Sequence, residues 1–82
     1  MKNTYTMFKI TRFVTPSFEP MFAVIDANDK PIFQYNPEAL QDSIVTHGKE
    51  KAFELFREEH VDAAADDKKE IVGEAIDFIE QQ

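Results

Sequence analysis

The sequence contains no cysteine and no tryptophan, and only two of its 82 residues are glycine. Without cysteine, disulfides, cysteine nucleophiles and thiolate zinc sites are excluded. With Gly48 and Gly73 as the only glycines, a glycine-rich phosphate-binding loop is excluded as well. Long apolar runs are also missing: the longest, residues 21–25, is far shorter than the roughly 20 residues that span a bilayer.

The length of the chain sets a second limit. Residues 1–82 suffice for one small domain, and a chain this short buries only about 60–65% of its unfolded surface. The first residues do not resemble a signal peptide, because Lys9 and Arg12 interrupt the apolar segment that such a peptide needs. Hydrophobic residues make up 43% of the composition, which is enough to form a core. We therefore expect a folded, water-soluble, cytoplasmic protein with no membrane contact.

Three segments in the first half of the chain have the composition of β-strands. Residues 4–14 are rich in β-branched and aromatic side chains, residues 21–26 are apolar on both faces, and residues 32–35 form a shorter run. Residues 27–30 favour a tight turn, because Asn and Asp side chains bond the local backbone. The pattern predicts a three-stranded antiparallel sheet. The core-facing side of its first strand is expected to carry Phe8, Ile10 and Val14.

Asn36 and Pro37 mark the start of a helix. Asn accepts hydrogen bonds from free N–H groups at a helix start, and Pro has the fixed φ of the first helical position. Gly48 is a typical terminator, yet the apolar residues keep one helical phase across it. The alternatives are one kinked helix over residues 37–60 or two helices that meet near Gly48. We favour the break, because an unbroken helix would be about 36 Å long and would overhang a short sheet.

The last helix is expected over residues 64–81. Asp67 and Glu70 have the spacing of a capping box, and Ile71, Ala75 and Ile79 fall on one apolar side. The expected fold class is therefore α+β, with a three-stranded antiparallel sheet followed by two or three helices packed on one face.

The charge is distributed unevenly along the chain. Residues 1–35 carry four basic and three acidic side chains, whereas residues 36–82 carry five basic and thirteen acidic ones, for a formal net charge of −7. Six carboxylates fall opposite the apolar side of the last helix: Asp66, Asp67, Glu70, Glu74, Asp77 and Glu80. Because residues at i+3 and i+4 on a helix have Cβ atoms about 5–6 Å apart, these side chains are expected to form an acidic row.

Two interpretations of this acidic row remain open. It is either the solvated side of an amphipathic helix, which keeps the protein soluble, or a binding element for a basic partner. Since DNA-binding proteins display Lys and Arg toward phosphates, a row of carboxylates can occupy such a groove as a DNA mimic. Direct nucleic-acid binding by this chain is not expected, because its net charge repels phosphate.

The sequence contains no pattern typical of catalysis or metal binding. Ser17 and Ser43 lack the context of a nucleophile elbow. Glu58 and Asp62 have the i, i+4 spacing of ligands on one helix face, but His60 does not share that face. We therefore expect no enzyme activity, no cofactor and no bound metal.

Two aromatic side chains fall outside the expected core. Phe13 lies on the opposite strand face, and Phe18 lies in a loop bounded by Pro16 and Pro20. We expect Phe18 to tuck beneath this loop; the alternative is an exposed apolar patch of the kind found at protein contacts. The favoured function is a non-catalytic protein-binding regulator or inhibitor that presents the acidic helix to a basic partner, such as a nucleic-acid-binding protein. The alternative is a homodimer or larger homo-oligomer joined through the second sheet face around Met7, Phe13 and Phe18.

Overall fold

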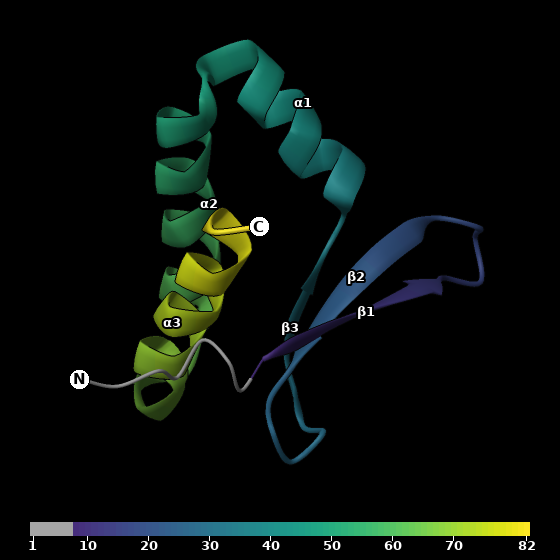
Figure 1. Cartoon of the computed structure of the whole chain (residues 1–82), viewed down its shortest axis with the longest axis vertical. Coiled ribbons are helices and arrows are strands. Elements are labelled where there is room, and N and C mark those ends of the chain that lie inside the picture. Colours follow the sequence, from purple (N-terminus) through teal and green to yellow (C-terminus); the bar gives the residue numbers. More distant parts are fainter. Residues whose placement is uncertain (1–7) are drawn as a thin grey trace.

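The computed structural model describes residues 8–82, in which an antiparallel sheet is followed by helices (Figure 1). The strands are β1 (Lys9–Val14), β2 (Pro20–Ile25) and β3 (Pro31–Tyr35). The helices are α1 (Pro37–His47), α2 (Lys49–Ala63) and α3 (Lys69–Glu80), with a short 3₁₀ turn, η2 (Asp66–Lys68), before α3. This order confirms the predicted α+β fold.

The sheet is a meander in which β2 lies between β1 and β3. Ile10 lies opposite Val24, and Val24 lies opposite Phe33, so these apolar side chains share the face that packs on the helices. Within the described residues the first strand begins at Lys9, and residues 4–7 of the expected strand lie outside them. The other two strands match their predicted bounds to within one residue.

The turn between β2 and β3 is held by the side chain of Asp26. Its Oδ1 accepts hydrogen bonds from the backbone N–H groups of Asn28 and Lys30, each at 2.9 Å. Asp29 has a left-handed backbone with φ 62°, a conformation that Asp tolerates better than most residues. The predicted bonding of an Asx side chain to the local backbone therefore forms this turn.

Helix α1 begins where the Asn36-Pro37 pair predicts. Asn36 Oδ1 accepts hydrogen bonds from the backbone N–H groups of Glu38 at 2.8 Å and Ala39 at 3.1 Å. The helix ends at Gly48, whose φ of 88° separates α1 from α2. The chain is therefore broken at Gly48, as we favoured, and a single helix through this position is excluded.

The start of α3 differs from the prediction. The chain leaves α2 at Ala63 and passes through η2, so α3 begins at Lys69 and not at residue 64. The predicted capping box of Asp67 and Glu70 is wrong, because the 3₁₀ turn runs directly into α3 and no side chain caps either start. Among residues 8–82, none of the helices has both the length and the apolar character needed to cross a membrane.

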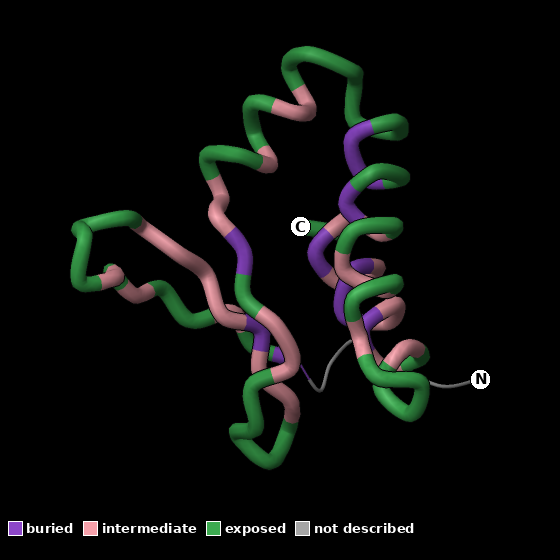
Figure 2. The backbone as a smooth tube through the Cα atoms, turned by 180° about the vertical axis from the view of Figure 1, so that it is seen from behind, coloured by how far each residue is buried: buried purple, intermediate pink, exposed green. Residues whose placement is uncertain are grey.

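The core lies between the sheet and the pair α2 and α3, where the buried positions gather (Figure 2). Its buried members are Phe8, Val24, Tyr35, Phe53, Phe56, Val72, Ala75, Ile76 and Ile79. Val14, which we expected on the core side of β1, is instead 55% exposed. The reason is that the outer end of the β1–β2 hairpin extends beyond α2 and α3 (Figures 1 and 2).

Candidate functional site

The carboxylates that the sequence singles out gather mainly on the solvent side of α3. Val72 and Ile79 are buried in the core, and at 100° per residue Glu70 and Glu74 fall on the opposite side of the helix. The preceding turn η2 carries two further exposed acids. Four of the six predicted carboxylates therefore lie on the solvent side: Asp66, Asp67, Glu70 and Glu74.

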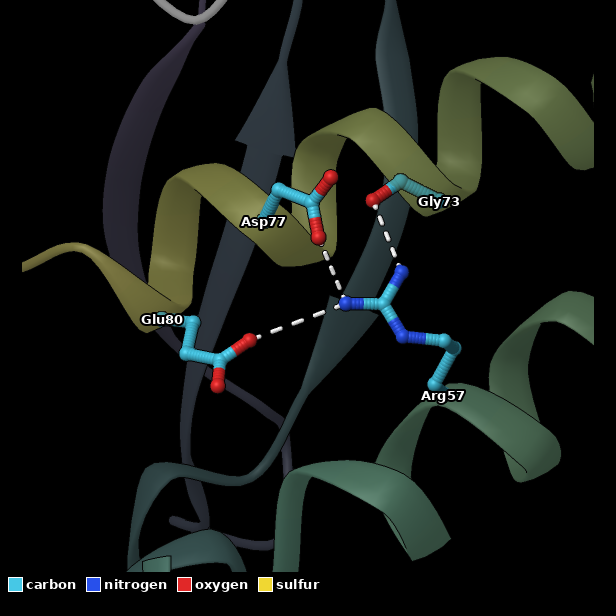
Figure 3. Close-up of polar contacts among 4 residues, drawn as sticks. All are labelled: Arg57, Gly73, Asp77 and Glu80. Atoms are coloured by element: carbon cyan, nitrogen blue, oxygen red, sulfur yellow. Dashed lines mark hydrogen bonds and ion pairs between the residues drawn. The ribbon is translucent and has the colours of Figure 1, made fainter. Parts of the chain in front are cut away.

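The other two predicted carboxylates, Asp77 and Glu80, bind Arg57 of α2 (Figure 3). Arg57 Nη2 lies 2.6 Å from Asp77 Oδ1 and 3.7 Å from Glu80 Oε1, and its Nη1 donates to the Gly73 carbonyl oxygen at 3.3 Å. The three charged side chains are between 37% and 40% exposed. Because water screens charges at this exposure, each ion pair contributes at most about 1 kcal/mol. The predicted row is thus divided, since its last two members are turned toward α2.

The Lys69 ammonium group is hydrogen-bonded to backbone carbonyl oxygens and does not pair with the carboxylates of α3. Its Nζ donates to the carbonyl oxygens of Val61 at 2.9 Å, Asp62 at 3.3 Å and Ala64 at 3.1 Å. These carbonyls belong to the C-terminal end of α2, which lacks intrahelical donors and favours a positive charge. Lys69 therefore caps α2 from the first residue of α3.

A second row of acids lies on α2 beside Arg57. Glu54 and Glu58 are exposed, one helical turn apart, and about 60° and 100° around the helix from Arg57. Glu54 lies 3.4 Å from Lys51 Nζ, and both side chains are more than half exposed. The two rows form one surface across α2 and α3, called the acidic face from here on: Glu54, Glu58, Asp66, Asp67, Glu70, Glu74, Asp77 and Glu80.

Phe18 is 86% exposed at the outer end of the β1–β2 hairpin, so the expectation that it tucks beneath the loop is wrong. Its φ of 65° is left-handed, which costs a residue with a Cβ about 1–2 kcal/mol. Thr15 imposes this geometry: its carbonyl accepts from the Phe18 N–H at 2.8 Å, and its Oγ1 accepts from the Glu19 N–H at 3.1 Å. The hairpin extends beyond α2 and α3 (Figure 1), so the core does not cover this residue.

The second sheet face contains one of the residues expected at an oligomer contact. Phe13 is half-buried on β1 and lies opposite Met21 of β2. Met7, which we grouped with Phe13 and Phe18, lies outside the described residues.

A groove of about 310 Å³ lies between α1, α2 and the end of β3. The rings of Tyr35 and Phe56 lie in it edge to face with centroids 5.2 Å apart, and Leu40 and Leu55 contribute apolar walls. Tyr35 is only 6% exposed, and burial raises the pKa of its hydroxyl group. The groove is therefore an apolar depression that can receive a side chain or a small apolar group.

His60 is fixed at the edge of this groove. Its Nδ1 lies 3.0 Å from the Phe56 carbonyl oxygen and donates to it, because a carbonyl only accepts. Its ring lies 4.4 Å from that of Phe56 and 4.9 Å from that of Phe33, measured between centroids. Glu58 and Asp62 lie on the other side of α2. Within residues 8–82, no three His, Asp or Glu side chains are grouped so that they could hold a metal ion.

Arg57, Lys69 and the groove were not identified from the sequence. A weak signal was present for Arg57, because it is the only Lys or Arg between Lys51 and Lys68, in a stretch rich in acids. No comparable signal exists for Lys69 or for the groove, whose lining comes from separate elements.

Comparison of the chain with protein-family models, with curated proteins and with solved structures finds no match.

Proposed function

We propose that this chain is a non-catalytic protein-binding module that regulates or inhibits a partner by presenting its acidic face to a basic surface. One observation carries the proposal: two helices that run antiparallel side by side (Figure 1) place eight carboxylates on adjoining sides, of which Asp77 and Glu80 are paired with Arg57 and Glu54 with Lys51. Arg57 lies between the rows, but it is bound to Asp77 and Glu80, and Lys69 is bonded to backbone carbonyls.

The spacing of the carboxylates supports a basic protein surface as the occupant. The Cβ atoms of neighbouring acids on one helix lie about 5–6 Å apart, whereas duplex DNA carries one charge per about 1.7 Å of axis. A single helical row thus carries about a third as many charges per unit length as the duplex. The second row, on α2, brings the charge density closer to that of DNA. A protein surface that otherwise binds nucleic acid is one partner of this kind.

The cost of the acidic face also supports a binding role. Glu54 with Glu58, and Glu70 with Glu74, are like charges at i, i+4, and each such pair costs about 0.2–0.5 kcal/mol. Solubility alone is achieved as well by a surface on which both signs alternate, which avoids this repulsion. Like charges kept together are typical of a surface that complements an opposite field.

The test is a variant that removes three charges and leaves the ion pairs of Arg57 intact. Asp67→Asn, Glu70→Gln and Glu74→Gln together preserve shape and change only exposed or half-exposed acids of the acidic face. Tagged wild-type protein is used to capture basic proteins from a lysate, which are then eluted with a salt gradient and identified. We expect a captured partner to bind the triple variant much more weakly, and to bind the wild type less tightly as salt is raised.

The matched control has the same change in net charge at a different place. Glu38→Gln, Asp42→Asn and Glu50→Gln lie on α1 and at the start of α2, and all three residues are exposed. This control should bind the partner as the wild type does. If the partner binds nucleic acid, the wild type and the control should displace a labelled duplex, and the triple variant should not. Binding that is insensitive to salt and survives the triple change would contradict the proposal.

A further inference from the structure

The outer end of the β1–β2 hairpin is a rigid apolar knob. The Thr15 N–H donates to the Glu19 carbonyl at 3.0 Å, which adds a third hydrogen bond across the tip. Pro16 and Pro20 restrict the chain on both sides of Phe18. The backbone at Phe18 is therefore restricted, and 86% of the residue's surface is in water. A strained, exposed aromatic residue that is fixed in advance loses little conformational entropy when it binds.

The groove between α1 and α2 is a socket of suitable chemistry for such a knob. Tyr35 and Phe56 line the groove but are only 6% and 7% exposed, so a third ring contacts the small part of each that water reaches, beside the apolar side chains of Leu40 and Leu55. Leu55, on the wall, remains 36% exposed. The volume of about 310 Å³ is at the lower end of the range for ligand pockets, about 300–1,000 Å³, and so suits a single side chain.

The knob and the socket are neighbours on one side of the molecule. Glu19, next to Phe18, accepts a hydrogen bond at 2.6 Å from the side-chain nitrogen of Asn36, and Asn36 lines the groove. Met21, three residues after Phe18, also lines the groove. Phe18 does not enter the groove of its own chain, because it is exposed.

The charges around the knob and the socket are complementary between two copies. Arg12, near the outer end of β1, is exposed, and Glu19, the acid of the tip, is bonded to Asn36. Glu59 on α2 lines the groove and is exposed. A second copy that approaches with its hairpin thus brings a guanidinium group toward the carboxylate of Glu59.

We propose that two copies of this chain form a symmetric dimer in which Phe18 of each copy occupies the α1–α2 groove of the other. A two-fold axis between the knob and the socket satisfies both contacts at once and closes the assembly. The acidic face is on the other side of α2 and remains free, so this contact is separate from the proposed function. Each Phe18 buries on the order of 150–250 Å², so the interface is small, and the dissociation constant is roughly micromolar or weaker.

The first experiment is analytical ultracentrifugation over a wide range of concentration. The wild type should pass from monomer to dimer as concentration rises. Phe18→Gly should raise the dissociation constant at least roughly 30-fold, as expected for the loss of a central aromatic anchor. Glycine adopts the φ of 65° without strain, so the variant should melt no lower than the wild type, and the loss of the dimer does not reflect unfolding.

The groove is tested by Leu55→Glu, with Val45→Glu as its matched control. Both replace an exposed apolar residue of a helix by the same acid, but Val45 is 75% exposed and does not line the groove. Leu55→Glu should weaken the dimer as Phe18→Gly does, and Val45→Glu should leave it unchanged.

Mixing the two defective variants distinguishes knob-in-socket exchange from any other dimer. The copy with Leu55→Glu retains Phe18, and the copy with Phe18→Gly retains an intact groove, so one of the two contacts is restored. We expect a heterodimer from variants that do not dimerise alone, with isotope-filtered NOEs from Phe18 of one copy to Tyr35 of the other. A monomer up to about 1 mM, a dimer that survives Phe18→Gly, or no heterodimer in the mixture would each overturn the exchange. The variant with Asp67→Asn, Glu70→Gln and Glu74→Gln should dimerise as the wild type does. The test of the dimer and the test of the acidic face can therefore fail independently of each other.

Discussion

Asn36 performs two tasks at the junction of β3 and α1, and its replacement tests both. Its Oδ1 caps the helix by accepting from the N–H groups of Glu38 and Ala39 at 2.8 and 3.1 Å. Its Nδ2 donates to Glu19 Oε2 at 2.6 Å, which ties the tip of the hairpin to the start of α1. Asn36→Ala removes both interactions.

The expected magnitude follows from these contacts. Loss of an N-cap side chain costs about 1 kcal/mol, within a range of about 0.5–2 kcal/mol. The tether to Glu19 is exposed, so it adds less than about 1 kcal/mol. Asn36→Ala should therefore lower the free energy of unfolding by about 1–2 kcal/mol. In a domain of this size each kcal/mol lowers Tm by about 4–8 °C.

Asn36→Ser separates the two tasks. Serine retains an oxygen that accepts from the helix N–H groups, but it is too short to reach Glu19. Thermal and urea unfolding should place Asn36→Ser close to the wild type and well above Asn36→Ala. Amide exchange at Phe18 and Glu19 should quicken in both variants, because both lose the tether. If Asn36→Ser melts as low as Asn36→Ala, or if Asn36→Ala melts like the wild type, capping at Asn36 does not stabilise the start of α1.

Three further substitutions test separate features of the fold. Burial raises the pKa of the Tyr35 hydroxyl group above its ordinary 10.0, so the folded state holds the hydroxyl proton more tightly than the unfolded state does. The stability that this difference contributes is complete below about pH 10 and is lost as pH rises through the folded pKa. Urea unfolding between about pH 8 and pH 11 should therefore lose stability less steeply for Tyr35→Phe than for the wild type, and equal slopes would refute the assignment. Arg57→Gln leaves both Asp77 and Glu80 unpaired, so it should cost at most about 2 kcal/mol at low salt and less at high salt; a cost that grows with salt would be inconsistent with screened ion pairs. Gly48→Ala should cost about 1–3 kcal/mol because φ is 88° there, although a Cβ would meet no atom within 4 Å. Gly73→Ala, in the middle of α3, is its control and should be neutral or stabilising by up to about 1 kcal/mol, since its new Cβ meets only Arg57 Nη1 at 3.7 Å.

The parts of the fold that the sequence predicts correctly are those whose causes lie within a few residues. The cap at Asn36, the turn held by Asp26 and the break at Gly48 depend on hydrogen bonds or backbone angles of neighbouring residues. The division into strands and helices depends on the period of apolar residues, which is also local. The capping box at Asp67 was predicted by the same local logic and is wrong, because the 3₁₀ turn before α3 depends on how α2 ends.

The candidate binding surfaces depend on the tertiary structure more than the helices and strands do. The sequence places acids on the solvent side of the last helix, but the pairing of Asp77 with Arg57 joins residues 20 positions apart. That pairing requires the antiparallel packing of α2 on α3, which a helical wheel of either helix does not contain. The same packing brings Lys69 to the end of α2 and adds Glu54 and Glu58 to the acidic face.

Phe18 shows most directly what the sequence alone does not determine. The sequence identifies an aromatic residue in a proline-bounded loop, which is compatible with burial and with exposure. The outcome depends on whether the loop lies over the core, and the hairpin instead extends past α2 and α3. By itself, the sequence determined most of the secondary structure, the fold class and the sign of the charge on the C-terminal helices, because these follow from local bonding and periodicity. Only the tertiary structure decided which carboxylates are paired, where the groove lies and that Phe18 is exposed, because each depends on distances between segments remote in the chain.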